Sequence, residues 1–386
     1  MHVIPYGRQD ITTEDIEAVA AVLRSDFLTQ GPAVPRFEKS VSDYCGVTHA
    51  VAVNSATSAL HIACLALGLG PGDWLWTSPI TFVASANCAL YCGASVDFVD
   101  IDARSGNMSV DALAAKLEAA ERDDRLPKIV VPVHLSGQSC DMAAIKALSD
   151  RYGFRISEAA SHAIGGRYRD RPVGDCVYSD ITVFSFHPVK IVTSGEGGMA
   201  LTNDAELAHR MELFRSHGIT RDAARMGREP DGPWYYEQVE LGYNYRITDI
   251  QAALGASQMT RIDRYVTRRH EIADAYDRRL HNLPLTLPWT LPDAYSALHL
   301  YVVRLRDGGR AKHRAAFDAL RASGIGVNLH YIPVHLQPYY RGLGFRPGTF
   351  PEAELYYEQA ISIPMFPMMT SEDVDRVIVA LEDAVL

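Results

Sequence analysis

The stretch that decides the fold starts at residue 49, where HAVAVNS (49–55) is followed by TSALHIACLAL (57–67) and WLWTS (74–78). The first and third segments are short and apolar, as buried strands are, whereas the second has the length and pattern of a helix. The same alternation continues in TFVASANCALYC (81–92), ASVDFVDID (94–102), VDALAAKLEAAE (110–121), KIVVPVH (128–134), DMAAIKALSDRYG (141–153) and FRIS (154–157). Strands that alternate with helices in this way predict a mostly parallel sheet covered by helices on both faces.

Further along the chain, DITVFSF (180–186) and GMALTN (198–203) predict two more strands around a glycine-rich loop, which makes seven in all. An Arg-rich stretch at 217–240 is too irregular to be core. After a long predicted helix at 247–266, the pattern changes to two strands among three helices. These lie at 298–305 and 324–332, and at 311–323, 352–361 and 370–385. We therefore expect an α/β chain with a large domain at 1–249 and a small C-terminal α/β domain at 250–386.

Composition and charge exclude several classes of function. With 386 residues, 47% of them hydrophobic and 22% charged, the chain has the composition of a globular protein. Its formal net charge of −10, without any block of Lys or Arg, argues against a surface that binds nucleic acid. No apolar run approaches the roughly 20 residues that span a bilayer, and the first ten residues lack the pattern of a signal peptide.

The cysteines predict a reducing environment. All six lie in the first half of the chain, at positions 45, 64, 88, 92, 140 and 176. Cys88 and Cys92 are the only close pair, and their spacing fits one face of a helix better than a metal site. We expect reduced thiols, no bound metal and a cytoplasmic location.

Among only six lysines, Lys190 has an unusual position. The other five lie among polar neighbours in or beside helices and at a strand entrance, which is typical of solvated surface amines. Lys190 instead follows the apolar strand ITVFSF (181–186) and precedes the glycine-rich loop TSGEGG (193–198). Burial there would lower the pKa of the amine and free it as a nucleophile. A lysine that forms Schiff bases indicates pyridoxal phosphate as a cofactor.

That cofactor needs a phosphate site, and VNSATSALHIA (53–63) predicts one where a strand leads through small residues into a helix. Ala56, Thr57 and Ser58 would offer free backbone N–H groups and hydroxyls at the positive end of this helix. Ordinary helix caps have the same composition, so the segment alone does not decide. Ser185 adds a hydroxyl near Lys190, and Phe82 could stack on an aromatic ring, although phenylalanine at a helix start is more often core.

Eight segments, in order and across both expected domains, match a known family. They are IPYGRQDI (4–11), LTQGP (28–32), VNSATSALHIA (53–63), SPITFVASANC (78–88), FSFHPVKIVTSGEGG (184–198), RSHGI (215–219), GPWYYEQVELGYNYRITDIQAALG (232–255) and VNLHYIPVHLQPYY (327–340). Over essentially its whole length the chain resembles the DegT/StrS-type sugar aminotransferases, which have the aspartate-aminotransferase fold (fold type I of the pyridoxal-phosphate enzymes). Within that family it is most similar to the transaminases of pseudaminic acid biosynthesis. These move the amino group of L-glutamate to C4 of a UDP-linked 2-acetamido-2,6-dideoxy-4-ketohexose.

The resemblance assigns roles to individual residues. Lys190 would carry pyridoxal 5′-phosphate and move protons between it and the sugar carbon, with the pyridoxamine form arising during the reaction. Four cofactor contacts are implied: Thr57, Ser58 and Ser185 on the phosphate and Phe82 on the ring. His162 would lie beside the ring and its 3-oxygen. Asn244 would reach the phosphate of a neighbouring subunit, which implies a homodimer with shared sites.

On the substrate side the resemblance implies Tyr6, Thr29, Arg246 and His330. Two of these have simpler explanations. Arg246 could form a surface ion pair, and His330 could be a core histidine at a strand end.

One position departs from the family pattern. Where the family has Glu-Asp before Ala-Ser-His, this chain has Glu158-Ala159-Ala160-Ser161-His162. Ala159 thus occupies the cofactor-binding position of the aspartate that keeps the pyridine nitrogen protonated. Glu158 is not expected to replace it, because neighbouring residues on a strand point to opposite faces. Losing one partner of a buried ion pair costs about 3–5 kcal/mol, which would slow the reaction by about two to four powers of ten.

Ala159 leaves two explanations open. It is either an engineered change in an otherwise active enzyme, which the intact remainder of the site favours, or a feature of a natural member with altered chemistry. The functional alternatives are another pyridoxal-phosphate-dependent nucleotide-sugar enzyme, such as a 3-amino transaminase or a dehydratase, and a non-catalytic binding protein. Retention of Lys190 argues against the dehydratases, which replace that lysine.

Overall fold

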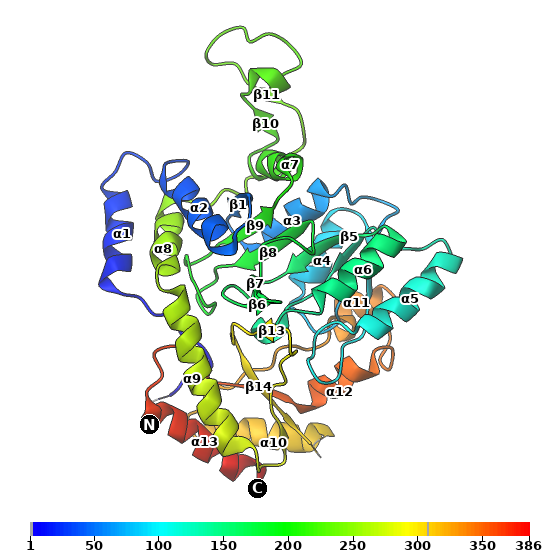
Figure 1. The fold of residues 1–386 in the computed structure, drawn as a ribbon, viewed down its shortest axis with the longest axis vertical. Helices are drawn as coiled ribbons and strands as arrows, with labels where there is room; N and C mark the ends of the chain where they lie inside the picture. Colours follow the sequence, from blue (N-terminus) through cyan, green and yellow to red (C-terminus); the bar gives the residue numbers. More distant parts are fainter. Residues whose placement is uncertain (1–2, 307–308) are drawn as a thin grey trace.

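A seven-stranded sheet forms the centre of the computed structural model, which describes residues 3–306 and 309–386 (Figure 1). Its strand order is β1-β9-β8-β5-β4-β2-β3. The strands are β1 (His49–Val53), β2 (Trp74–Thr77), β3 (Ser95–Phe98), β4 (Ile129–Val131), β5 (Arg155–Ala159), β8 (Ile181–Ser185) and β9 (Gly198–Thr202). Only β9 runs antiparallel to its neighbours, β1 and β8. The predicted mostly parallel, seven-stranded sheet is therefore confirmed.

Helices cover both faces of this sheet because its strands are apolar on both sides. On one face, α3 (Ala56–Ala66), α4 (Ala84–Tyr91) and α7 (Ala205–Arg215) share one apolar cluster with strand residues such as Val51, Val53 and Val183. On the other face, α2 (Ala33–Cys45), α5 (Val110–Arg122), α6 (Met142–Tyr152) and α8 (Asp249–Met259) complete two further clusters. Side chains at the N-caps of α3, α5, α6 and α7 accept backbone N–H groups of the first turn, which fixes where these helices begin.

The C-terminal part has its own three-stranded sheet, β12-β14-β15. The strands are β12 (Leu285–Thr286), β14 (Tyr301–Leu305) and β15 (Ala360–Ile363), and the helices are α9 (Ile262–Leu280), α10 (Gly309–Ala322), α11 (Pro338–Gly342), α12 (Pro351–Gln359) and α13 (Ser371–Val385). The long helix expected at 247–266 is divided, since α8 ends at Met259 and α9 starts at Ile262. Here α8 packs on α2 and on α1 (Thr13–Leu23), and α9 packs on α13. The division at residue 249 stays a prediction.

Two expectations for this part are wrong. The segment 324–332 forms no regular strand, because the N-terminal residues compete for its backbone: Gly326 N–H donates to Ile4 O, and only Asn328 bridges to β15. The strand that pairs with β14 is β15 (Ala360–Ile363), which is buried. Its first two residues were expected to be the end of the helix at 352–361. The N-terminal segment thus lies against residues 324–326 of the C-terminal part.

The irregular stretch at 217–240 projects from the body as a long arm (Figure 1). It contains β10 (Ile219–Thr220) paired with β11 (Glu237–Gln238) and a short 3₁₀ turn at Ala223–Arg225. Trp234, near its end, is 72% exposed. The other small elements are the sheet of β6 (Arg167–Tyr168), β7 (Arg171–Pro172) and β13 (Ala294–Tyr295), and 3₁₀ turns at Leu135–Gly137 and Val334–Leu336.

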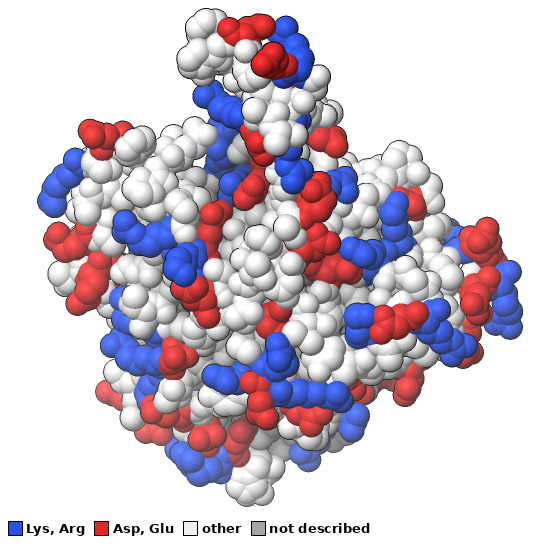
Figure 2. Space-filling model, turned by 45° about the horizontal axis from the view of Figure 1, so that its top comes forward, with Lys and Arg blue, Asp and Glu red and all other residues white. Residues whose placement is uncertain are grey.

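The surface carries both signs of charge. On the face shown in Figure 2, basic and acidic side chains alternate without forming one large positive field. Within residues 3–306 and 309–386, no helix is long and apolar enough to cross a membrane.

Candidate active site

Lys190 lies in the loop that follows β8. Its backbone N–H donates to His187 O, and Ser194 N–H donates back to Phe186 O, so the loop closes on the end of the strand. Four of the other lysines pair with aspartates, whereas Lys190 has no carboxylate partner among the described residues. Burial alone lowers the pKa of Lys190 to about 7. A large share of this amine is therefore neutral near pH 7, as a nucleophile or base must be.

The start of α3 is the place where the sequence predicts a phosphate site. Ser55 caps the helix by accepting Ser58 N–H at 3.1 Å, and the Ser58 hydroxyl donates to Asn54 Oδ1 at 2.7 Å. Ser58 is therefore held within the protein. The N–H groups of Ala56 and Thr57, and the Thr57 hydroxyl, have no partner in the described part of the chain, so they are the groups that remain free for a dianion.

Gly198 brings this helix start to the end of β8. A Cβ at this position would lie 2.4 Å from the Ser55 carbonyl carbon and 2.5 Å from Ala56 N, so only glycine lets the backbones approach. Gly198 pairs with Val53 of β1 on one side and with Ser185 of β8 on the other. The Ser185 hydroxyl thus comes from the strand end beside the free N–H groups.

His162 is held by hydrogen bonds on both ring nitrogens. Ser136 N–H donates to Nδ1 at 3.2 Å, and Nε2 lies 3.1 Å from the Tyr331 hydroxyl. Because Nδ1 accepts, the proton of the neutral ring is on Nε2 and points at the oxygen of Tyr331. Burial, and then the charge of Lys190, hold the pKa of His162 well below its usual range. Gly137, next to Ser136, allows the two segments to approach each other. Its φ is +107°, and a Cβ at this position would lie 3.0 Å from His162 O.

Aromatic residues lie beside His162. Tyr331 lies 6.4 Å from the ring of Phe82 and 5.0 Å from the ring of His330, which in turn is 5.4 Å from Tyr6. Burial, and then Lys190, lower the pKa of His330 to about 4, and its Nδ1 lies 2.8 Å from the Ser362 hydroxyl. Tyr6, His330, Tyr331 and Phe82 thus form one aromatic group next to His162, and the charge of Lys190 acts on both of its histidine neighbours, His162 and His330.

The other predicted residues are placed elsewhere. Thr29 bridges to Thr248, and Arg246 bridges to Val53 at the end of β1. Arg246 lines a hollow with Gln30, Glu38 and Arg215, and no contact within the described residues joins Thr29 or Arg246 to Lys190. Asn244 pairs with Ser216 through its backbone and is exposed. Arg246 therefore lies beside the strand that leads into α3, and no described hydrogen bond joins any of the three residues to Lys190 or His162.

Ala159 and Glu158 point to opposite faces of β5, as expected. Ala159 is 5% exposed and belongs to an apolar cluster. The Glu158 carboxylate lies 2.5 Å from His134 Nε2 and accepts hydrogen bonds from Thr182, at 2.9 Å, and from Ser179. Burial alone would raise the pKa of Glu158, but these donors lower it. Glu158 is fully engaged away from the site and does not replace the missing aspartate.

Sequence reasoning missed three contributors. Tyr331 stands in VNLHYIPVH directly after the predicted His330, so the matched segment contained a signal. No signal marked Ser136 or His299. Ser136 lies in a short 3₁₀ turn and His299 lies just before β14, and neither segment has an unusual sequence. The ring of His299 lies 4.5 Å from that of His162, and its buried Nδ1 has no partner within the described residues.

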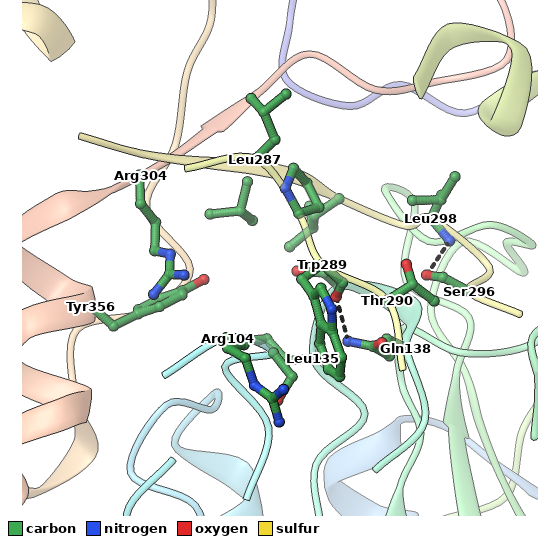
Figure 3. Close-up of a pocket in the computed structure, with 15 residues that line it drawn as sticks. Arg104, Leu135, Gln138, Leu287, Trp289, Thr290, Ser296, Leu298, Arg304 and Tyr356 are labelled. Carbon is green, nitrogen blue, oxygen red and sulfur yellow. Dashed lines mark hydrogen bonds between the residues drawn. The ribbon is translucent and has the colours of Figure 1, made fainter. Parts of the chain in front are cut away.

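A separate cleft lies between the loop after β4 and the C-terminal sheet (Figure 3). Arg104 stacks on Trp289 with its guanidinium 4.5 Å from the ring centre, and Gln138 donates to Trp289 O at 3.1 Å. Its lining includes Ser136 and Leu298 but none of the predicted site residues. The cleft adjoins the site through Ser136, whose N–H donates to His162, and through Tyr356, whose hydroxyl donates to His330 O at 3.1 Å.

The residues around Lys190 fit a phosphorylated aldehyde such as pyridoxal phosphate at two of three points. The free N–H groups of Ala56 and Thr57 fit its phosphate, and the largely neutral amine of Lys190 fits its aldehyde carbon. At the third point, where a pyridine nitrogen would meet β5, the chain presents the methyl group of Ala159.

Comparison with known proteins agrees with this geometry. Residues 9–382 match the DegT/DnrJ/EryC1/StrS aminotransferase family. The spore coat polysaccharide biosynthesis protein SpsC of Bacillus subtilis is 41% identical, with 100% of this chain and 97% of SpsC covered. The fold matches Helicobacter pylori PseC, an aminotransferase involved in the biosynthesis of pseudoaminic acid, with a TM-score of 0.90 and 30% identity over 99% of each chain. It also matches the PLP-form of the Streptococcus pneumoniae sugar aminotransferase Spr1654, with a TM-score of 0.89 and 28% identity over 100% of each chain.

These matches confirm the predicted fold type and class of enzyme. Aminotransferases of this family use pyridoxal 5′-phosphate, so the predicted cofactor is confirmed as well. The chain belongs to the DegT/DnrJ/EryC1/StrS aminotransferase family.

Proposed function

We propose that the chain transfers the amino group of L-glutamate to C4 of a UDP-linked 2-acetamido-2,6-dideoxy-4-ketohexose, a precursor of pseudaminic acid. The observation that carries the proposal is the Lys190 amine, whose pKa is about 7 and whose charge acts on His162, in the loop after β8, the strand whose end lies beside the free helix start through Gly198. The names of PseC and SpsC, which refer to pseudoaminic acid and to a polysaccharide, support a sugar as the amino acceptor.

Each group near Lys190 has a role in this proposal. The N–H groups of Ala56 and Thr57, with the hydroxyls of Thr57 and Ser185, would hold the phosphate of the cofactor. Ser58 supports them indirectly, because its N–H donates to the capping hydroxyl of Ser55 and its own hydroxyl donates to Asn54 Oδ1. Phe82 would cover the ring on one side. When bound, pyridoxal phosphate supplies an electron-accepting ring that makes a C–H bond next to nitrogen acidic enough to break.

Lys190 and Tyr331 are the groups that would handle protons. Lys190 Nζ would take a proton from the carbon of glutamate and return one to the sugar carbon, which its pKa near 7 permits in both directions. Since Nε2 of His162 donates to Tyr331, the hydroxyl proton of Tyr331 remains free to donate into the site. Tyr6 and His330 would face the sugar.

Ala159 would slow this enzyme without preventing cofactor binding. No carboxylate is presented at the end of β5 to hold the ring nitrogen protonated, because Glu158 is bound to His134, Ser179 and Thr182. The phosphate and amine contacts do not depend on that group. We therefore propose a complete binding site with impaired proton abstraction.

We further propose a homodimer in which each site is shared. Two features support it: Phe82 is 59% exposed although it would cover the cofactor, and Asn244 is exposed on the outer side of its own chain. Asn244 of the partner subunit would then reach the phosphate, and Thr29 and Arg246 of the partner subunit would reach the sugar nucleotide. The surface near Asn244 carries Leu241, which is 76% exposed, as expected of an interface residue.

Mixing two defective chains tests the shared site. In a heterodimer of Lys190→Ala and Asn244→Ala, one site carries both defects and the other carries none. Random mixing after denaturation should therefore return about a quarter of the cofactor-dependent signal of the unchanged protein. If no signal returns although heterodimers form, each site belongs to a single chain.

A non-catalytic binding protein is the second candidate, and Ala159 is the observation that favours it. Purified protein loaded with pyridoxal phosphate is mixed with L-glutamate, and the absorbance is followed as the cofactor passes to its pyridoxamine form. Slow but complete conversion supports an aminotransferase. No conversion over hours, with cofactor still bound, would establish a binding role.

The sugar is tested by supplying UDP-linked 4-keto sugars of both C5 configurations with L-glutamate. Formation of a UDP-linked 4-amino sugar, identified by mass spectrometry and NMR, supports the proposed substrate class. Amination only of a 3-keto sugar would instead identify a 3-amino transaminase. The free state of all six cysteines supports a cytoplasmic location for this reaction.

A further inference from the structure

Arg269, on α9, is a buried arginine that the proposed reaction does not use. It is 1% exposed, and its Nη1 donates to the carbonyl oxygens of Leu298 and His299, both at 3.1 Å, and of Met365, at 2.9 Å. In the described part of the chain it forms no ion pair with a carboxylate, and its buried Nε has no hydrogen-bond partner. A buried charge without an ion-pair partner is costly, so the contacts with the three carbonyls need an explanation.

Two of these carbonyls belong to a turn with an unusual backbone, residues 297–300. Leu298 has a φ of +49°, a left-handed conformation that is rare for leucine and that persists only where surrounding contacts hold it. Its N–H donates to the Ser296 hydroxyl at 3.0 Å, and its carbonyl accepts from Arg269. The guanidinium of Arg269 therefore helps to fix the path of this turn.

The same turn holds the loop that contacts His162. Ala297 N–H donates to Gly137 O at 2.9 Å, and Leu300 N–H donates to Ser136 O at 3.2 Å. Ser136 N–H then donates to Nδ1 of His162 at 3.2 Å. Hydrogen bonds thus connect the buried guanidinium, through the turn and the loop, to a ring nitrogen of His162.

The ring of His299 adds a direct contact between this turn and the site. It lies 4.5 Å from the ring of His162. Burial, and then the basic groups around it, hold the pKa of His299 well below its usual range. These groups are His162, Lys190, Arg269 and His330. His299 is therefore neutral near pH 7, and it covers one side of His162 without adding a charge.

We propose that Arg269 is a positioning residue for His162. By holding the carbonyls of Leu298 and His299, it fixes the backbone that donates to Nδ1 of His162 and so keeps the ring proton on Nε2. Without that donor, the tautomer with the proton on Nδ1 would be populated as well. A guanidinium suits this role because it is planar and can donate to several carbonyls at once. The inference rests on the proposed function only in that His162 takes part in it.

Nitrogen NMR of the cofactor-free protein, with ¹⁵N-labelled histidine, tests the tautomer directly. The signals of His162, assigned with His162→Gln, should show one neutral form with the proton on Nε2. In Arg269→Met the shifts of the two ring nitrogens should move toward each other, as in a mixture of tautomers. Arg268→Met is the matched control. Arg268 is the preceding residue on α9 and donates to Met369 O at 2.8 Å, but it is partly exposed and pairs with Glu271, so the signals should stay parental.

Kinetics of the loaded protein add a second measurement. The rate of the glutamate half-reaction should fall by about tenfold or more in Arg269→Met, at unchanged cofactor affinity. Arg269→Lys keeps a buried cation that can donate, so it should recover part of both the rate and the parental His162 signals. Circular dichroism checks that each variant is folded. If Arg269→Met does not fold, Ser296→Ala replaces it, because it removes the acceptor of Leu298 N–H and should shift the His162 signals in the same direction.

Parental His162 signals in every variant that folds would overturn the inference, whatever the activity of the enzyme. Shifted signals in Arg269→Met, with parental signals in Arg268→Met, support it. If the signals shift in this way but the unchanged protein never reacts with glutamate, the positioning role of Arg269 stands and the proposed function fails.

Discussion

Two histidines on opposite sides of β5 have the same hydrogen-bonding pattern but different partners. His134 accepts Cys140 N–H on Nδ1 at 3.1 Å, just as His162 accepts Ser136 N–H at 3.2 Å. In each ring the proton is therefore on Nε2. Nε2 of His134 faces the carboxylate of Glu158, whereas Nε2 of His162 faces the hydroxyl of Tyr331.

The difference separates a structural histidine from a reactive one. Glu158 accepts from three side chains and has no proton to give, so the His134 side of the strand is fully satisfied. Tyr331 accepts one hydrogen bond and still has its own proton to donate. Beside it, the pKa values of Lys190 and His162 are lowered by burial, so this side contains groups whose neutral forms are favoured. Buried polar groups that use all their hydrogen-bonding capacity stabilise the fold, whereas groups with a donor or acceptor left over are available for chemistry.

The strongest way to break the reactive side is Lys190→Met. Loss of the amine removes both the attachment of the cofactor and the proton carrier, so the rate of the glutamate half-reaction should fall by about 10⁴-fold, the upper end for acid–base groups. Stopped-flow absorbance measures this rate. The matched control is Lys312→Met on exposed α10, which should keep the parental rate.

Ala159→Asp should have the next largest effect, in the opposite direction. A carboxylate at the end of β5 would pair with the ring nitrogen and raise the single-turnover rate with glutamate by about 10²-fold or more. Ala159→Asn is the control, since it has the same shape without the charge. Equal rates in all three proteins would show that the chain works without this acid and would favour altered chemistry or a binding role.

Tyr331→Phe should cost about tenfold to 10²-fold in the same half-reaction. The change removes the free hydroxyl proton and leaves Nε2 of His162 without its acceptor, a loss of about 1–3 kcal/mol. Tyr339→Phe, at a side chain that is 66% exposed, should be neutral. A rate change in Tyr331→Phe without a shift in cofactor affinity supports proton donation, whereas weakened affinity alone would indicate that Tyr331 only shapes the pocket.

Glu158→Gln should affect stability more than rate. An amide cannot accept from His134, Thr182 and Ser179 as a carboxylate does, so the free energy of unfolding should fall by about 1–3 kcal/mol. Denaturation in urea measures this loss. A variant as stable as the parent, but with a much slower half-reaction, would place Glu158 in the chemistry and contradict the comparison.

The last prediction concerns the pH dependence of stability. The pKa of Lys190 is about 7 in the fold, and that of an unfolded lysine is about 10.4. Between these values the unfolded chain binds more protons, so the free energy of unfolding of the cofactor-free protein gains a contribution that rises with pH. The difference between the parent and Lys190→Met should therefore change across pH 7 to 10 and level off above it. A constant difference would mean that the amine is not buried.

The sequence predicts the central sheet better than it predicts the connections between distant segments. Apolar periodicity was enough for β1 to β5, β8 and β9, and the position of Lys190 after β8 follows from the same local signals, whereas its role and the phosphate site stay predictions. Residues 324–332 and β15 were misjudged, since their pairing depends on Ile4 and Tyr301, far away in the sequence. For the same reason Ser136, His299 and the pairing of His134 with Glu158 could not be foreseen. A hydrogen bond between distant segments leaves no pattern in either one.

Trapping the cofactor on the chain tests the central claim most directly. The protein is incubated with pyridoxal phosphate, reduced with borohydride and digested, and the labelled peptide is sequenced by mass spectrometry. If the buried amine beside His162 and Tyr331 is the reactive group, the label is found on Lys190 at one per chain, and glutamate added before the borohydride removes it. Label on any of the other five lysines, or none on Lys190 while the cofactor stays bound, would contradict the assignment of the active site.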